Sequence, residues 1–196
     1  MDEMLKVTLS KKLSYLLRHD TKIKRDNGGW VQLDQIQDAL IKQHLIEIVK
    51  TSEKNRFEYD VVNNKIRARQ GHSVENIREE ELLTPLSTDK DGKINGKEYA
   101  VHSTFMSCIP QIRKSGLSKM KRNHIHMVLA DLEDIKSLNH KGTIPGLRKN
   151  ANAFIAIHLQ KAEFAGCKFA ISGNGVLLSA GNTDGCIPWN CCTLFY

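Results

Sequence analysis

A polar segment over residues 79–97 divides the chain into two parts with different patterns of apolar residues. It combines Pro85, Gly92 and Gly96 with charged side chains, which is typical of a turn-rich connection. Upstream of it the apolar residues recur at helical spacing, and downstream they gather in short β-prone runs. A chain of 196 residues is long enough for two cores of roughly a hundred residues each. We therefore predict an α+β protein whose domains are residues 1–92 and 93–196.

The first lobe begins with a strong helical pattern. Four leucines recur at the spacing of one helical face: Leu9, Leu13, Leu16 and Leu17. The pattern stops near Asp20, so Arg18 and His19 are expected at the C-terminal end of this helix. Asp34 is expected to cap a second helix, and a third is expected over residues 43–51.

A β-hairpin is expected after these helices. Residues 56–59 and 65–69 are short strand-like runs, and Asn63 and Asn64 between them tolerate the left-handed conformation of a tight turn. Helices followed by a hairpin predict a winged-helix lobe.

The second lobe has the pattern of a compact mixed or antiparallel sheet with few helices. Its strand-like runs cover residues 99–102, 125–129, 153–159, 169–172 and 176–179. One helix is expected over residues 105–114, and the SGNG sequence at 172–175 is expected to join the last two strands as a hairpin.

The charge of the chain favours a polyanionic partner. Residues 93–196 hold 13 basic and 6 acidic side chains, which account for the whole net charge of +7, since residues 1–92 hold 16 of each. Lys and Arg bind phosphates in a sequence-independent way. No apolar run approaches the ~20 residues of a membrane helix, and the charged start does not resemble a secretory signal. We expect an intracellular protein that is not bound to a membrane.

Cysteine usage signals neither disulfides nor zinc. The chain has five cysteines and no CxxC pair, so a disulfide framework and a zinc site are both unsupported. A reducing compartment fits this pattern.

Four clusters place Arg or His beside small residues: LRHD at 17–20, RARQGHS at 67–73, VHST at 101–104 and SGLSKMKRNHIHM at 115–127. None of them matches a Walker loop, a GxGxxG fingerprint, a Ser-His-Asp signature or a metal motif. Guanidinium groups are permanently charged and bind phosphate oxygens through a planar fork of donors. The residues alone therefore indicate phosphate recognition.

Six segments, taken in order, resemble the NAD-dependent RNA 2'-phosphotransferases of tRNA splicing. They are LSKKLSYLLRH, GGWVQLDQI, RFEYD with IRARQGHS, VHST, SGLSKMKRNHIHM and GNGVLLSAG. The resemblance implies a winged-helix lobe joined to an ADP-ribosyltransferase-like lobe, working without a metal. The implied partners are NAD and 2'-phosphorylated RNA, with spliced tRNA as the expected RNA, and the protein is expected to be a monomer in the cytoplasm or nucleus.

The activity implied by the resemblance is removal of the splice-junction 2'-phosphate from ligated tRNA. The phosphate is transferred to NAD through an RNA-2'-phospho-ADP-ribose intermediate. The products are RNA with a free 2'-hydroxyl, ADP-ribose 1'',2''-cyclic phosphate and nicotinamide.

The resemblance also implies roles for individual residues. The catalytic Arg-His-Arg-Arg set corresponds to Arg18, His19, Arg67 and Arg122. Arginines can stabilise charge on the transferred phosphate, and His19 is a candidate for either phosphate binding or proton transfer. Arg69 shares a strand face with Arg67 by period-two alternation, which makes it a candidate secondary RNA contact.

A second implied set binds NAD. It comprises His102, Ser103, Thr104, Ser115, Gly116, Leu117, His124, His126, Arg148, Asn174, Gly175 and Val176. Ser103 stands where the family has glycine, so either a glycine conformation or the space beside the dinucleotide is in question. Purely structural interpretations stay open: a core-facing strand for His124 and His126, and a simple β-turn for residues 174–176.

Two other functions remain as alternatives. One is an ADP-ribosyltransferase that modifies a nucleic-acid phosphate and stops there. The other is a non-catalytic winged-helix binder of nucleic acid. Nicotinamide release and loss of a 2'-phosphate from RNA distinguish all three.

Overall fold

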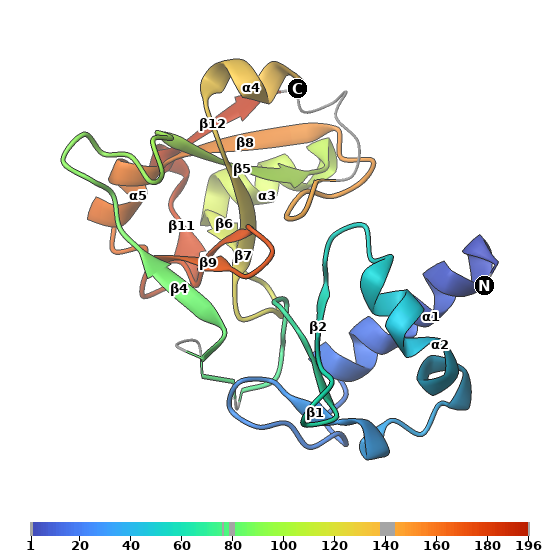
Figure 1. Cartoon of the computed structure of the whole chain (residues 1–196). Coiled ribbons are helices and arrows are strands. Elements are labelled where there is room, and N and C mark those ends of the chain that lie inside the picture. The colour runs from blue at the N-terminus through green and yellow to red at the C-terminus, as the bar shows by residue number, and fades with distance from the viewer. Residues whose placement is uncertain (1, 76, 79–80, 138–143, 196) are drawn as a thin grey trace. The chain divides into compact units, whose positions relative to one another are not determined.

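The computed structural model describes residues 2–75, 77–78, 81–137 and 144–195. The chain forms two compact units, Met1–Leu83 and Thr84–Tyr196 (Figure 1). The domain boundary predicted after Gly92 remains a prediction. No helix among the described residues is long and apolar enough to cross a membrane.

Helix α1 (Glu3–Arg18) begins the first unit and ends where the leucine pattern predicts. The Asp2 carboxylate caps its N-terminus by accepting a hydrogen bond from the backbone of Met4 at 3.0 Å. Leu9, Leu13 and Leu17 are buried. Arg18 is the last helical residue and His19 is the C-cap, so both lie at the helix end, as expected.

The prediction of two further helices in this unit was wrong. Asp34 lies in a short 3-10 turn, η1 (Leu33–Gln35), and a single helix, α2 (Ala39–Lys50), follows. Asp38 is the cap of α2, and its carboxylate accepts a hydrogen bond from the Ile41 backbone at 3.0 Å. Two aspartates four residues apart both satisfy the sequence rule for a cap, and the extended backbone of Ile36 delays the helix to the second.

A three-stranded antiparallel sheet completes the first unit, with the order β1 (Val31–Gln32), β3 (Lys65–Ala68), β2 (Phe57–Asp60). The predicted hairpin of β2 and β3 is confirmed, and Asn64 in its turn has a positive φ of 51°. Leu13, Ile41 and Phe57 belong to one apolar cluster between helices and sheet. The winged-helix assignment stays a prediction.

The second unit is built around a seven-stranded sheet. In spatial order its strands are β12 (Cys192–Phe195), β8 (Ala153–His158), β5 (Tyr99–Thr104), β7 (Ile125–Ala130), β10 (Leu177–Ser179), β9 (Phe169–Ser172) and β4 (Leu83–Leu86). The pairs from β12 to β9 are antiparallel. A separate pair joins β6 (Leu117–Ser118) to β11 (Cys186–Ile187). The protein is thus an α+β protein with antiparallel sheets.

Short helices lie between these strands. The predicted helix is present as η3 (Met106–Cys108) and α3 (Ile109–Ser115). Three more were not predicted: α4 (Leu132–Ser137), α5 (Leu159–Phe164) and η5 (Trp189–Cys191). None exceeds six residues, which is too short for a helical apolar pattern to repeat.

The segment expected to be a linker contains ordered structure. Leu83–Leu86 forms strand β4, and Ile94 is only 2% exposed. Its composition is that of a turn, but β4 belongs to the seven-stranded sheet and Ile94 lies in the core of the second unit. Residues 79 and 80 of this segment lie outside the described residues.

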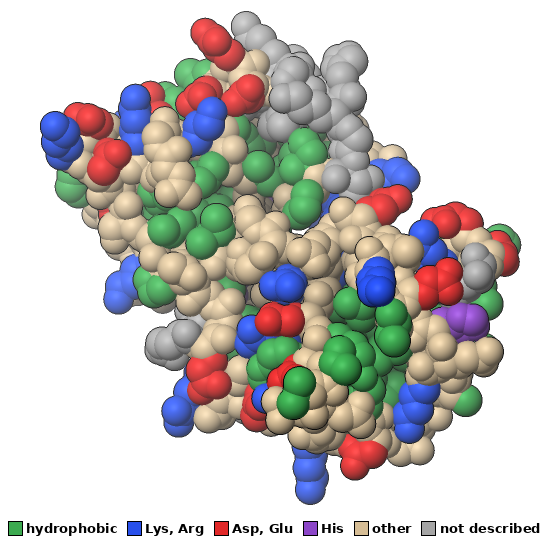
Figure 2. Space-filling view, in the orientation of Figure 1, with side chains coloured by type: hydrophobic (Ala, Val, Ile, Leu, Met, Phe, Trp, Pro, Cys, Tyr) green, Lys and Arg blue, Asp and Glu red, His purple; other side chains and the backbone are tan. Residues whose placement is uncertain are grey.

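Charged side chains of both signs are interspersed over the face seen in Figure 2. No broad basic area occupies this view.

Candidate functional site

The C-terminal end of α1 is held by the guanidinium group of Arg25. It donates hydrogen bonds of 2.5 to 2.9 Å to four backbone carbonyls: those of Leu16, Leu17, Asp20 and Ile23. Burial lowers the pKa of Arg25, and the nearby charge of Asp20 opposes this shift. A half-buried cation therefore fixes the backbone on both sides of Arg18 and His19.

Ser73 connects this helix end to the RARQGHS segment. Its backbone N–H donates to the Arg18 carbonyl at 3.1 Å, and its hydroxyl lies 2.9 Å from Nδ1 of His19. The rings of Tyr15 and His19 are also in contact, with centroids 5.9 Å apart. The first two sequence clusters are thus brought together in the first unit, and the ring of His19 is oriented by a hydroxyl.

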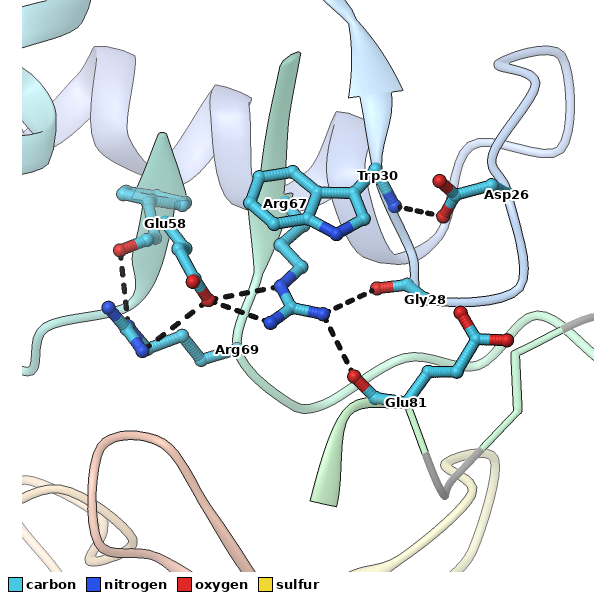
Figure 3. Close-up of polar contacts among 8 residues, drawn as sticks. Asp26, Gly28, Trp30, Glu58, Arg67, Arg69 and Glu81 are labelled. Carbon is cyan, nitrogen blue, oxygen red and sulfur yellow. Dashed lines mark hydrogen bonds and ion pairs between the residues drawn. The ribbon is translucent and has the colours of Figure 1, made fainter. Parts of the chain in front are cut away.

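Arg67 projects from β3 and is surrounded by protein acceptors (Figure 3). Nε and Nη2 lie 3.0 and 2.9 Å from one oxygen of Glu58, and Nη1 donates to the carbonyls of Gly28 and Glu81. The guanidinium carbon lies 4.5 Å from the centre of the Trp30 ring, a cation–π contact. This side chain is 16% exposed, so we expect its replacement to destabilise the first unit.

Arg69 shares the face of Arg67, as period-two alternation predicts. Its Nη1 lies 3.5 Å from the same oxygen of Glu58, and its Nε donates to the Phe57 carbonyl at 3.3 Å. Figure 3 shows the Glu58 carboxylate between the two arginines. The role of Arg69 as an RNA contact stays a prediction.

In the second unit, His102 lies on β5 beside β7. Its Nδ1 is 2.8 Å from the backbone carbonyl of His126. Because a carbonyl oxygen can only accept, Nδ1 carries a proton and Nε2 is the acceptor nitrogen of the neutral ring. Burial lowers the pKa of His102, as do the charges of Arg148 and Arg122, while the bond to His126 opposes the shift. The surroundings thus favour a neutral His102.

Arg122 and Arg148 lie near each other and near His102. Burial by neighbouring groups lowers the pKa of Arg122, although part of the residue is exposed, and repulsion from Arg148 lowers it further. Nη1 of Arg122 lies 3.5 Å from Nδ1 of His126, and the guanidinium of Arg148 lies over the Phe105 ring at 5.2 Å. Within the described part of the chain, neither arginine forms an ion pair with a carboxylate.

Ser103, at the position where the resemblance leads us to expect glycine, has a backbone conformation that any residue can adopt. It is an ordinary strand residue of β5, paired with Phe154, and it is not among the residues with positive φ. A glycine conformation is therefore not required. Its buried hydroxyl accepts a hydrogen bond from the Arg148 backbone at 2.5 Å. Thr104, the next residue, is also buried.

The residues predicted around 115–117 make clear structural contacts. The Ser115 hydroxyl donates to the Gln111 carbonyl at 3.0 Å, and Leu117 is buried and pairs with Ile187. Gly116 has a φ of 80°, and a side chain there would lie 2.8 Å from the Ile187 carbonyl. Glycine is thus required for packing, and the role of these residues in NAD binding stays a prediction.

The hairpin at 174–176 lies between β9 and β10, and β10 pairs with β7. Gly175 has a φ of 78° and donates to the Ser172 carbonyl at 2.8 Å, which confirms the predicted turn. Asn174 contacts the Ser172 hydroxyl at 2.8 Å, and Val176 is fully buried. Leu178 of β10 faces His126 in the register, so adjacent strands carry this hairpin and the histidines.

His124 and His126 are each 9% exposed, so the core interpretation and the NAD interpretation both remain open. Supporting residues were missed by the sequence analysis, notably Arg25, Ser73 and Glu58. Arg25 follows the helix by seven residues in a polar connector, and no local pattern marks it as a cap. In the part of the chain that is described, no group of three or more His, Cys, Asp or Glu side chains is placed to hold a metal ion.

These features define a class of protein in which each unit brings arginine and histidine side chains together: Arg18 beside His19 in the first unit, and Arg122 beside His126 in the second. Residues 4–181 match the family described as RNA 2'-phosphotransferase, Tpt1 / KptA family. The chain belongs to this family.

Individual relatives match nearly the whole length of this chain. A probable RNA 2'-phosphotransferase of Rhizobium johnstonii is 31% identical over 191 residues, covering 91% of each chain. The tRNA 2'-phosphotransferase 1 of Danio rerio is 32% identical, covering 94% of this chain and 82% of the relative. The protein of the same name from Mus musculus is 35% identical, covering 91% and 72%.

Proposed function

We propose that this chain is an NAD-dependent phosphotransferase that removes the splice-junction 2'-phosphate from ligated tRNA. Its membership of the RNA 2'-phosphotransferase family supports the substrate and the group transferred. The observation that carries the proposal is the grouping of Arg122 and His102 around His126, at 3.5 and 2.8 Å. Burial lowers the pKa of His102, and the charges of Arg148 and Arg122 both act on it in the same direction. Among the described residues neither arginine has a carboxylate partner, and such a pair of cations suits a polyphosphate ligand.

The chemistry of this group fits NAD. The two arginines are suited to the dinucleotide pyrophosphate, because guanidinium donors match phosphate oxygens. A neutral His102 with its proton on Nδ1 presents Nε2 as an acceptor, which suits a ribose hydroxyl. NAD supplies the ribose carbon that receives the phosphate and the nicotinamide that leaves.

In the proposed first step, an oxygen of the RNA 2'-phosphate forms a bond to C1'' of the NAD ribose. The bond from C1'' to nicotinamide breaks, and nicotinamide leaves, giving RNA-2'-phospho-ADP-ribose. In the second step the ribose 2''-oxygen bonds to phosphorus and the bond from phosphorus to the RNA 2'-oxygen breaks. The proton lost by the 2''-hydroxyl is balanced by the one gained at the RNA 2'-oxygen, and ADP-ribose 1'',2''-cyclic phosphate is released.

Arg18, His19, Arg67 and Arg122 are assigned to the RNA phosphate in this proposal. Negative charge grows on the nonbridging oxygens when phosphorus is attacked, so arginines stabilise the second step more than the first. Ser73 supports the assignment of His19, because the contact at Nδ1 orients the ring. Arg67 contributes by exchanging part of its contact with protein oxygens for the phosphate.

The test is incubation with NAD and an RNA oligonucleotide carrying one internal 2'-phosphate. Nicotinamide release and phosphate loss are measured together, with the same oligonucleotide lacking the 2'-phosphate as the control substrate. Loss of the phosphate with stoichiometric nicotinamide release is expected. Accumulation of ADP-ribosylated RNA by the unsubstituted chain would indicate an enzyme that stops after one step. If neither nicotinamide release nor phosphate loss is detected, the protein is a non-catalytic binder of nucleic acid.

A pair of variants tests the residue assignment. Arg122→Ala and Lys121→Ala each remove one positive charge from the same exposed loop. Arg122→Ala is expected to accumulate RNA labelled from NAD, visible as a slower band on a gel, whereas Lys121→Ala is expected to turn over normally. If the two variants accumulate the labelled RNA to the same extent, Arg122 has no specific role in the second step.

A further inference from the structure

The backbone that carries Arg148 is attached to the central sheet at two points. At Gly146 it runs so close to β7 that a side chain there would lie 2.9 Å from the Met127 carbonyl. At Arg148 the backbone N–H donates to the hydroxyl of Ser103 on β5 at 2.5 Å. Ser103 is 3% exposed, so the hydroxyl that accepts this hydrogen bond is buried, although Arg148 itself is exposed.

These two points set the position of the Arg148 side chain. From the anchored backbone, the guanidinium group extends over the ring of Phe105, which directly follows β5 and caps η3. There its charge acts on His102 and on Arg122. Arg148 and Arg122 repel each other, so the backbone anchor opposes a movement that would separate them.

We propose that Ser103 is a positioning residue for the anion-binding group of the second unit. Its hydroxyl holds the Arg148 backbone so that the guanidinium stays beside Arg122 and His102 and meets the pyrophosphate of NAD. This inference rests on the proposed function for the identity of the ligand. Ser103 itself does not touch the ligand and acts through Arg148.

The test compares Ser103→Ala with a matched control, Ser179→Ala. Ser179 is 1% exposed, lies on β10 and accepts a backbone hydrogen bond from Gly181 at 3.1 Å, so the same kind of contact is lost in both. Ser103→Ala is expected to raise the KM for NAD about tenfold, as for one lost hydrogen bond to a buried group. The kcat at saturating NAD should change less than about twofold, and Ser179→Ala should change neither value.

A double-mutant cycle shows whether Ser103 acts through Arg148. Ser103→Ala is combined with Arg148→Ala, and the KM for NAD is measured for the pair and for each single variant. The serine substitution should have little further effect once the arginine side chain is absent. Additive losses would overturn the proposal, because they would show that Ser103 affects NAD by another route.

Amide hydrogen exchange provides a readout that does not depend on activity. Residues 144–150 are expected to exchange faster in Ser103→Ala than in the parent, and to keep their protection in Ser179→Ala. If the parent chain releases no nicotinamide, the proposed function fails, and exchange still decides whether the anchor exists. Unchanged exchange in Ser103→Ala would overturn the anchor whatever the activity.

Discussion

Replacement of Arg67 by alanine is expected to destabilise the first unit strongly. The substitution leaves the Glu58 carboxylate with Arg69 at 3.5 Å and removes the donor from two backbone carbonyls. It also removes the guanidinium from the face of Trp30. Breaking a buried charge pair costs about 3–5 kcal/mol. Since Glu58 is 33% exposed, water and Arg69 offset part of this, and we expect a loss of about 3 kcal/mol in the free energy of unfolding.

Urea unfolding followed by Trp30 fluorescence measures this loss. The chain has two tryptophans, and a Trp189→Phe background isolates the signal of the first unit. With a slope of about 2 kcal/mol per molar urea, the midpoint should fall by about 1.5 M. Arg69→Ala is the matched control, because it leaves the closer partner of Glu58 in place, and its loss should be about 1 kcal/mol.

Arg67→Lys separates charge from geometry. Lysine keeps a cation beside Glu58 but lacks the fork that reaches Gly28 and Glu81, so its midpoint should lie between those of the parent and the alanine variant. An Arg67→Ala midpoint within about 0.3 M of the parent, less than 1 kcal/mol at this slope, would refute the reasoning. The contacts of Arg67 with protein oxygens would then contribute little to stability, and phosphate binding would be its remaining role.

Three further predictions follow from the same structure. Because the pKa of His102 is lowered in the folded protein, its contribution to stability is complete above the ordinary value of about 6.5 and is lost as pH falls below it. The thermal unfolding temperature should therefore fall less between pH 7.5 and 5.5 in His102→Gln than in the parent. Arg25→Ala leaves the carbonyls at the end of α1 without their donor and should lower both unfolding free energy, by about 2–3 kcal/mol, and turnover; unchanged circular dichroism melting would contradict this. Ser73→Ala should lower kcat more than the KM for RNA by releasing His19, and equal effects on both would argue against an orienting role.

The boundaries of α1 follow from the sequence because one leucine pattern ends at one place. The start of α2 does not, since Asp34 and Asp38 are equally good caps, and only the extended backbone of Ile36 and the packing around it decide between them. The short helices α4 and α5 have too few turns to show a pattern. Sequence patterns therefore predict long periodic elements, such as α1. They fail where two residues are equally good caps and tertiary contacts determine which one begins the helix.

The surroundings of Arg67 depend on the hairpin register. A two-residue turn at Asn63 and Asn64 would pair position 62 with 65, whereas the structure pairs Asp60 with Lys65. This longer turn brings Glu58 opposite Arg67. The carbonyls of Gly28 and Glu81 come from distant parts of the chain, and no local pattern predicts them. The sequence could therefore identify Arg67 as important but could not show that protein oxygens already surround it.

The arginines of this protein differ in what balances their charge. Arg25 and Arg67 are held by protein oxygens, whereas Arg122 and Arg148 lie close enough to repel each other. Holding like charges together costs free energy in the ligand-free protein, and an anion bound between them removes that cost. Fixing them in advance, through the backbone anchor at Ser103 in the case of Arg148, means that less free energy is spent on ordering when a polyphosphate binds. The same residue type thus stabilises the fold in one setting and, in the function we propose, prepares a binding site in the other.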